Sequence, residues 1–173
     1  MLDIYAHYIQ NTAVLFAQKA PTLPAFQADL AARSRRYPVL VAEQDGTVVG
    51  YAYASPFHSG PAYDWSAETT IYLRPDCRGQ GLGRALYERL EALLRQQNVL
   101  RLYACIVHTD TGDAYLTSAS ENFHRALGFV KNTHFAKCGC KFGKWYDVIW
   151  MEKVLGPQEG VAVPFLPFDA RQK

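Results

Sequence analysis

The chain has 173 residues, of which 49% are hydrophobic and 20% are charged, and its formal net charge is +2. This length suits one well-packed domain, and this composition is typical of a soluble globular protein. So small a net charge, with basic residues scattered along the sequence, argues against a nucleic-acid binder. No stretch approaches the ~18 apolar residues of a membrane span, and the N-terminus lacks the pattern of a secretory signal. We expect a cytoplasmic protein without nucleic-acid or membrane partners.

The four cysteines do not form a metal-binding pattern. They are Cys77, Cys105, Cys138 and Cys140. Only the last two are close in sequence, and a C-x-C pair lacks the spacing of a zinc site. We therefore expect reduced thiols and no metal.

Two helices are predicted before the first strand. Residues 2–17 carry apolar side chains at roughly helical spacing. Thr22 and Pro24 mark the start of a second helix that runs towards Arg36, and Pro38 ends it.

After Pro38 the sequence pattern becomes typical of strands. The segments 38–43 and 47–54 flank an Asp-Gly pair, which is a hairpin signal, and a third strand is predicted at 68–73. An amphipathic helix at 82–98, a buried strand at 101–107, a short helix at 120–127 and two closing strands at 129–135 and 145–153 follow. The order α-α-β-β-β-α-β-α-β-β predicts one α/β domain on a mixed sheet, covering 1–155, with a proline-containing arm at 156–173.

Between the third strand and the long helix the sequence reads CRGQGLGRALYERL, with three glycines in five residues. The first turn of a helix has backbone N–H groups without partners and lies at the positive end of the helix dipole. Glycine lets an anion approach this backbone closely, and each hydrogen bond to a charged acceptor contributes roughly 1.5–3 kcal/mol. The glycines predict a phosphate site, and a plain turn with glycines for packing is the alternative.

Two familiar phosphate loops do not fit this stretch. A P-loop requires Gly-Lys-Ser/Thr, but Gly83 is followed by Arg84 and Ala85. A dinucleotide fingerprint requires G-x-G-x-x-G, and the third glycine is replaced by Arg84 or by Leu86 in the two possible alignments.

The pattern Arg78-x-x-Gly81-x-Gly83 after a strand resembles the pyrophosphate loop of the GCN5-related N-acetyltransferases (GNAT), which hold acetyl-CoA. HRALGF, at the end of the short helix, matches that family as well. The resemblance implies the GNAT fold: a mixed, mostly antiparallel sheet flanked by helices, with two splayed strands that hold the cosubstrate. It assigns acetyl-CoA binding to Ile71, Leu73, Arg78, Gly79, Gln80, Gly81, Leu82, Gly83, Arg84, Thr117 and Ser120.

Within this family the chain looks most like the phosphinothricin acetyltransferases and their methionine sulfoximine and sulfone acetylating relatives. The segments RYPVLVAEQDG, AYDW and KFGKWYDV carry that resemblance, which runs from about Tyr37 to Trp150. Three features depart from it. The family has a short strand before its first helix, where Met1 already sits at the helix start. The loop 108–117 is longer than usual, and Thr117 replaces an asparagine that commonly contacts the CoA arm.

Acetyl transfer to an amine requires a neutral nitrogen and a proton for the leaving thiolate. A free α-amino group has a pKa of about 7.7–8.0, so a modest base suffices. By resemblance, Glu68 is the base or water relay, and His124 is the acid or base beside the sulfur and the amine. Phe57, Tyr63 and Lys141 are candidate substrate contacts. Members of this branch are commonly homodimers, and the closing strands with the arm are the expected contact.

The function predicted first is N-acetyltransfer to the α-amino group of a small amino acid or analogue. The same chemistry on a protein N-terminus or a polyamine stays open. A third possibility is a CoA-binding module without catalysis, against which the presence of Glu68 and His124 argues.

Overall fold

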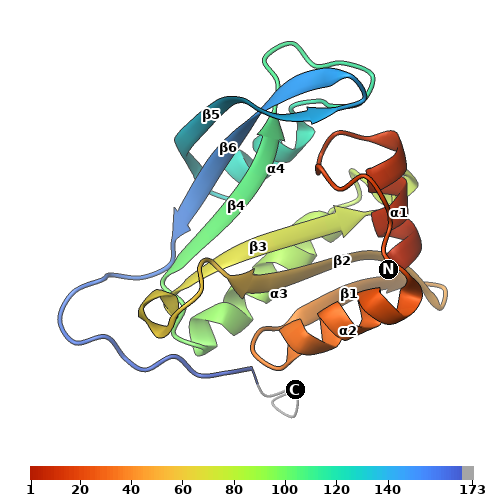
Figure 1. Ribbon diagram of the computed structural model, residues 1–173. Coiled ribbons are helices and arrows are strands. Elements are labelled where there is room, and N and C mark those ends of the chain that lie inside the picture. The colour runs from red at the N-terminus through yellow and green to blue at the C-terminus, as the bar shows by residue number, and fades with distance from the viewer. Residues whose placement is uncertain (169–173) are drawn as a thin grey trace.

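A computed structural model describes residues 1–168 as a six-stranded sheet with a pair of helices on each face (Figure 1). The elements follow the predicted order. The helices are α1 (Leu2–Asn11), α2 (Leu23–Ser34), α3 (Leu82–Gln96) and α4 (Ala119–Ala126). The strands are β1 (Val39–Gln44), β2 (Thr47–Pro56), β3 (Ser66–Leu73), β4 (Arg101–His108), β5 (Val130–Lys141) and β6 (Lys144–Val154). Two 3₁₀ turns, η1 (Pro61–Tyr63) and η2 (Pro75–Cys77), flank β3.

The sheet forks between β3 and β4. Its order is β1-β2-β3-β4-β6-β5, and every neighbouring pair is antiparallel except β3–β4. The parallel register runs only from Ser66↔Arg101 to Glu68↔Tyr103. Beyond that point β3 and β4 continue separately, and Figure 1 shows them diverging. Glu68 is therefore the last residue of β3 that pairs with β4, although β3 stays paired with β2 as far as Leu73.

Because side chains alternate along a strand, β3 presents different chemistry to the two helix pairs. Ala67, Ile71 and Leu73 belong to the main core with α3 and α4, which also contains the buried Leu90 and Leu94 of α3. Each fully buried side chain of this kind contributes about 1.5–3 kcal/mol. On the opposite face Tyr72 packs in a separate cluster with α1 and α2.

Helix α1 is shorter than predicted. The apolar spacing suggested a helix to residue 17, but the helix ends at Asn11, and Thr12 is extended with φ −139° and ψ 160°. The Thr12 hydroxyl donates to the carbonyl of Tyr8 (2.7 Å), and the N–H of Ala13 donates to the carbonyl of Tyr115 (2.9 Å). A tertiary hydrogen bond thus replaces the next helical one, and the apolar residues that follow pack elsewhere.

The strands confirm some of the sequence-based expectations and differ from others. The turn at Asp45 and Gly46, both with positive φ, confirms the predicted β1–β2 hairpin. The closing strands are longer than predicted because β5 continues through two irregularities in its register to Lys141. Strand β4 was expected to be buried throughout, but the side chain of Cys105 is exposed while Ala104 and Ile106 are buried. Within residues 1–168 no strand precedes α1, and β1 forms that edge of the sheet.

The arm beyond β6 lies against its own domain (Figure 1). The indole N–H of Trp65 donates to the carbonyl of Val163 (2.6 Å), and the amide of Asn98 donates to that of Pro164 (2.7 Å). The N–H of Leu166 donates to the carbonyl of Gln97 (3.1 Å). These bonds connect the arm to the loop before β3 and to the end of α3. Residues 169–173 of the predicted arm lie outside the described residues.

Candidate active site

A cleft of about 660 Å³ is lined from both faces of the sheet at the fork. Leu15 and Phe16 line it from the α1 side, and Phe123 and His124 line it from α4. Most of the residues predicted from the sequence lie in its wall, namely Glu68, Ile71, Leu73, Arg78, Gly79, Gly81, Gly83, Arg84, Thr117, Ser120 and His124. The fork therefore gathers the predicted cosubstrate loop and both predicted catalytic side chains around one space.

The three glycines of the turn have two different structural roles. Gly81 is the N-cap of α3 with φ +82°, Gly79 has φ +75°, and a Cβ on either would meet no atom within 4 Å. No side chain caps this helix start, so its backbone is open to an anion. Gly83 differs because a Cβ there would lie 3.1 Å from the ring of Phe123 and 3.3 Å from Leu73. It permits close packing, while the other two leave an open backbone that fits a diphosphate.

Arg78 adds a cation to this turn. Its guanidinium donates to the hydroxyl of Tyr8 (2.8 Å) and lies 5.3 Å from the centre of that ring. The same hydroxyl donates to the carbonyl of Leu73 (2.7 Å), which ties α1 to the end of β3. No carboxylate among the described residues pairs with Arg78, so its charge is available to an anion. Sequence reasoning missed Tyr8, since its place in the apolar stripe of α1 suggested only packing.

Glu68 stands at the junction of β3 and β4, partly buried. Burial raises the pKa of its carboxyl group, and the charge of Arg33 acts in the opposite direction. Cys105 also lines the cleft, where its side chain is exposed. A carboxylate with a raised pKa suits a base that has to accept a proton near neutral pH.

His124 is buried on α4 with both ring nitrogens engaged. Nδ1 lies 2.8 Å from the carbonyl oxygen of Ser120, which can only accept, so Nδ1 carries a hydrogen. In the neutral ring Nε2 is then the acceptor, and it lies 3.1 Å from the hydroxyl of Tyr87. Burial lowers the pKa of His124, and the bond to Ser120 opposes this effect. The arrangement favours a neutral imidazole whose Nε2 can take up a proton.

The predicted substrate contacts are not brought together. Phe57 stacks on Tyr103 (ring centres 4.1 Å apart) beside Trp150, and Tyr63 lies next to it. Lys141 is buried elsewhere. Its ammonium group donates to the carbonyl of Leu15 (2.9 Å), and burial lowers its pKa.

Five predicted residues lie outside the described lining of the cleft. They are Gln80, Leu82, Phe57, Tyr63 and Lys141. Residues that sequence reasoning did not assign to the site but that line it include Tyr8, Leu15, Phe16, Thr69, Cys105 and Phe123. A resemblance carried by short motifs offers no signal for these residues, because they come from separate elements.

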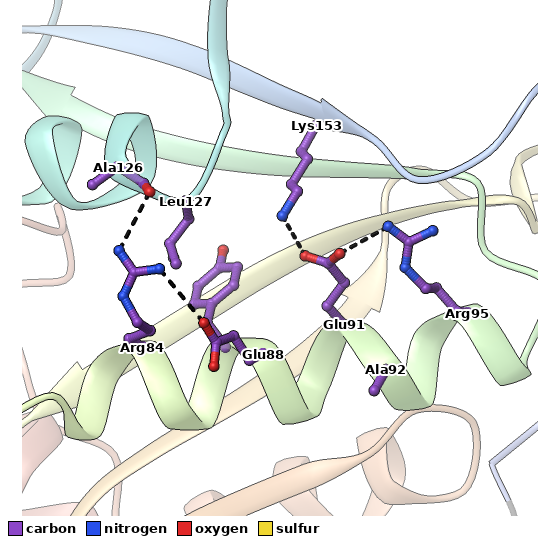
Figure 2. A pocket seen from close by; sticks show the side chains of 9 residues that line it. Arg84, Glu88, Glu91, Ala92, Arg95, Ala126, Leu127 and Lys153 are labelled. Atoms are coloured by element: carbon purple, nitrogen blue, oxygen red, sulfur yellow. Dashed lines mark hydrogen bonds and ion pairs between the residues drawn. The ribbon is translucent and has the colours of Figure 1, made fainter.

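A second hollow, of about 280 Å³, lies between α3, the end of α4 and Lys153 of β6 (Figure 2). Its charges are already paired. Figure 2 shows Glu91 between Lys153 (2.5 Å) and Arg95 (2.9 Å). Arg84 reaches Glu88 and the carbonyl of Ala126, both at 3.5 Å. These pairs, partly buried at Glu91–Lys153 and exposed at Arg84–Glu88, already engage the charged groups of this hollow, so the fork is the better candidate site.

Residues 1–168 show neither a membrane-spanning helix nor a cluster of metal ligands. None of the helices there combines the length and the apolar character that crossing a membrane requires. Within the same residues, no three His, Cys, Asp or Glu side chains converge as ligands for a metal ion.

Comparison with known proteins agrees with this geometry. Residues 1–150 match the family described as "Acetyltransferase (GNAT) domain". The phosphinothricin N-acetyltransferase of Streptomyces coelicolor is 32% identical over 162 residues, which cover 90% of this chain and 89% of that protein. The L-methionine sulfoximine/L-methionine sulfone acetyltransferase of Pseudomonas paraeruginosa is 33% identical, covering 91% of this chain and 88% of the relative.

A solved structure shows the same arrangement of the chain. The phosphinothricin acetyltransferase of Sinorhizobium meliloti, crystallised in complex with acetyl-CoA, superposes with a TM-score of 0.82 at 32% identity. The match covers 98% of this chain and 86% of that one. The resemblance predicted from the glycine-rich turn is confirmed, and the chain belongs to the GNAT family of acetyltransferases.

Proposed function

We propose that the protein transfers an acetyl group from acetyl-CoA to the α-amino group of a small amino acid or analogue, of the phosphinothricin or methionine sulfoximine type. The observation that carries the proposal is the fork itself. It places a bare helix N-terminus and a partly buried carboxylate, Glu68, around one cleft. The printed names of the relatives support the substrate class.

The cleft fits acetyl-CoA at both of its ends. The open backbone at Gly79 and Gly81, together with Arg78, suits the diphosphate. Beyond Glu68, Ile71 and Leu73 of β3 are not paired to β4, so this edge can bond the pantetheine arm, with Thr117 and Ser120 on the opposite wall. When bound, acetyl-CoA supplies an activated acyl thioester.

Glu68 removes a proton from the substrate ammonium group so that its nitrogen can attack. With an α-amino pKa of about 7.7–8.0 this deprotonation costs little at pH 7, whereas a lysine amine near 10.4 would cost roughly 4–5 kcal/mol. A single modest base therefore favours an α-amino substrate. The aromatic group of Phe57, Tyr103 and Trp150 near this end of the strands suits an apolar part of the substrate.

The charges around the cleft disfavour a polyamine. Among the described lining residues Glu68 is the one carboxylate, and two arginines, Arg78 and Arg84, also line the cleft. A polyamine requires several anionic partners, whereas an amino acid brings a carboxylate of its own. The alternative acceptor is a protein N-terminus. The alternative to catalysis is a role restricted to binding CoA.

The test is an amine panel in which release of the CoA thiol is measured with purified protein. The panel contains methionine sulfoximine, methionine sulfone, phosphinothricin, the common amino acids, spermidine and short peptides. Turnover of amino acids or their analogues is expected. Turnover restricted to spermidine or peptides would overturn the substrate class. Acetyl-CoA binding unchanged by Glu68→Gln and His124→Ala, without turnover of any amine, would establish a binding module.

The proposal also includes a cytoplasmic homodimer, and a catalytic domain at 1–155 followed by the arm at 156–173. Exposed aromatic side chains on β5, β6 and the turn between them support a contact there: Phe135 is 49%, Phe142 40% and Trp145 65% exposed. Analytical ultracentrifugation of the wild type and of Trp145→Ser tests this part. A monomeric wild type would remove the dimer from the proposal.

A further inference from the structure

A buried chain of hydrogen bonds connects His124 to the fork. Nε2 of His124 lies 3.1 Å from the hydroxyl of Tyr87 on α3, and that hydroxyl is hydrogen-bonded to the hydroxyl of Thr69 on β3. Thr69 in turn reaches the carbonyl oxygen of Tyr103 (3.1 Å). Tyr103 pairs with Glu68 at the last rung of the β3–β4 ladder. The chain thus runs from α4 to the point where the sheet opens.

Counting hydrogens shows that this chain has room for one more proton. It contains four hydrogen bonds, from Ser120 through His124, Tyr87 and Thr69 to Tyr103. Both carbonyl oxygens at its ends can only accept. A neutral imidazole and two hydroxyls supply three hydrogens, so one of the bonds lacks a proton. An imidazolium supplies the fourth, and every bond is then made in one direction.

His124 reaches the reacting atoms through these hydroxyls. His124 and Thr69 both line the cleft and Tyr87 does not, but both ring nitrogens of His124 are bonded inside the protein, to Ser120 and Tyr87. We propose that Thr69 and Tyr87 relay a proton between the fork and Nε2 of His124, so that the chain takes a proton from the attacking nitrogen and returns it to the sulfur. This role deepens the proposed function and rests on it.

The protons balance in both steps. As the N–C bond forms, the nitrogen gives its proton to the oxygen of Thr69, Thr69 passes its own to Tyr87, and Tyr87 passes its own to Nε2. As the C–S bond breaks, the three transfers reverse and Thr69 protonates the leaving thiolate. Glu68 removes the other proton of the substrate ammonium group, which leaves to solvent. No oxidant, reductant or further co-reactant is needed.

The surroundings of the chain suit a relay. Tyr87 is buried, and burial keeps the pKa of its phenol well above the ordinary value, an effect to which the charges of Glu91 and Glu68 add. Tyr87 therefore passes a proton on without becoming an anion. The rings of Phe123 and Phe129 pack against His124, with ring centres 5.3 and 5.2 Å from the centre of the imidazole. No carboxylate among the described residues is hydrogen-bonded to His124. The imidazole exchanges its proton with Tyr87 alone.

The test compares Tyr87→Phe, Thr69→Val and Thr69→Ser in the full chain. The first two remove one hydroxyl each, and we expect kcat to fall about 100-fold with the KM for acetyl-CoA unchanged. Thr69→Ser keeps a hydroxyl and is expected to restore most of the activity. Tyr51→Phe is the matched control, because Tyr51 is equally buried and its hydroxyl has no hydrogen-bond partner among the described residues.

Two readouts separate a relay from a structural effect. If the residues act as one unit, the double variant Tyr87→Phe/His124→Ala loses no more activity than either single variant. NMR titration of the His124 ring, assigned with His124→Ala, is expected to show a lower pKa in Tyr87→Phe, because the imidazolium loses its acceptor. Thermal unfolding and acetyl-CoA binding show whether each variant is folded. If Tyr87→Phe does not fold, Thr69→Val takes its place in the test.

Wild-type kinetics in both hydroxyl variants, or additive losses in the double variant, would overturn the relay and leave the proposed function intact. A wild type without turnover of any amine would overturn the proposed function instead. In that case the NMR titration still tests the hydrogen-bond chain from His124 to Thr69. An unchanged His124 pKa in Tyr87→Phe would refute it.

Discussion

The two sides of the fork are built in different ways. On the proposed cosubstrate side, the part assigned to the diphosphate is one continuous stretch from Arg78 to Arg84, with backbone groups at a helix start. On the proposed acceptor side, the side chains come from separate elements: Leu15 after α1 and Glu68 on β3 line the cleft, and the aromatic group of Phe57, Tyr103 and Trp150, outside its described lining, comes from directly after β2, from β4 and from β6. The first side depends on local backbone geometry, whereas the second exists only when distant segments pack together. Substitutions should therefore act differently on the two sides.

The largest effect is expected on the acceptor side, from Glu68→Gln. The variant keeps the shape of the side chain but cannot accept a proton, so kcat should fall about 10²–10³-fold while the KM for acetyl-CoA stays the same. Burial raises the pKa of Glu68, so wild-type activity should be lost on acidification above the range of an exposed glutamate. The variant should lack that ionisation in its pH profile of kcat.

The matched control for this carboxylate is Glu43→Gln, on the exposed surface of β1. It removes the same charge far from the fork and should leave both kinetic constants unchanged. A fall in kcat of less than about threefold for Glu68→Gln would show that the substrate amine reaches the cleft already neutral and that Glu68 is no base.

An intermediate effect is expected on the cosubstrate side, from Gly81→Val. Loss of one hydrogen bond from the backbone to the diphosphate costs roughly 1.5 kcal/mol, so the KM for acetyl-CoA should rise about tenfold or more while that for the amine changes little. Gly46→Val is a matched control. Gly46 also has a positive φ (+73°) and open space around it, but it lies in the β1–β2 hairpin.

Both glycine variants should lose similar stability from backbone strain, about 1–2 kcal/mol, and only Gly81→Val should affect acetyl-CoA. Steady-state kinetics, with acetyl-CoA and the amine varied in turn, measures the two KM values separately for each variant. Equal changes in both KM values for Gly81→Val would contradict the distinction between the two sides.

The same distinction explains what could be predicted from the sequence. The order of the elements, the hairpin at Asp45–Gly46 and the glycine-rich turn follow from short-range patterns, and the structure confirms them. Helix α1 was predicted too long because a hydrogen bond from Ala13 to Tyr115, a contact of long range, ends the helical path. No local pattern could show that Lys141 bonds to Leu15.

The positions of Glu68 and His124 followed from family motifs, but their partners did not. Thr69 and Tyr87 read as a strand residue and a core residue, and only the packing of α3 against β3 and α4 brings their hydroxyls together. Side-chain networks of this kind depend on three elements at once and leave no periodic signal in the sequence.

The smallest effect is expected at Asp113, which holds the loop after β4 to the start of β6. Its carboxylate accepts hydrogen bonds from the N–H groups of Tyr115 and Leu116 (2.7 and 2.9 Å), from Lys144 (3.0 Å) and from the hydroxyl of Tyr146 (2.9 Å). These bonds lower the pKa of Asp113 to about 2. They fix the loop after β4, which also receives the hydrogen bond from Ala13, against the start of β6.

Asp113→Asn should lower the free energy of unfolding at pH 7 by about 1–2 kcal/mol, as judged by urea denaturation. Because the folded-state pKa lies below the ordinary value of 3.8, the carboxylate stabilises the fold above about pH 4, and this contribution disappears as the pH falls towards 2. The difference between wild type and variant should therefore shrink over that range. Asp110→Asn, in the same loop but with a side chain 86% exposed, should change stability by less than about 0.5 kcal/mol. If Asp113→Asn left the free energy of unfolding within about 0.5 kcal/mol of the wild type, these bonds would not hold the loop, and an assembled part of the site would not depend on them.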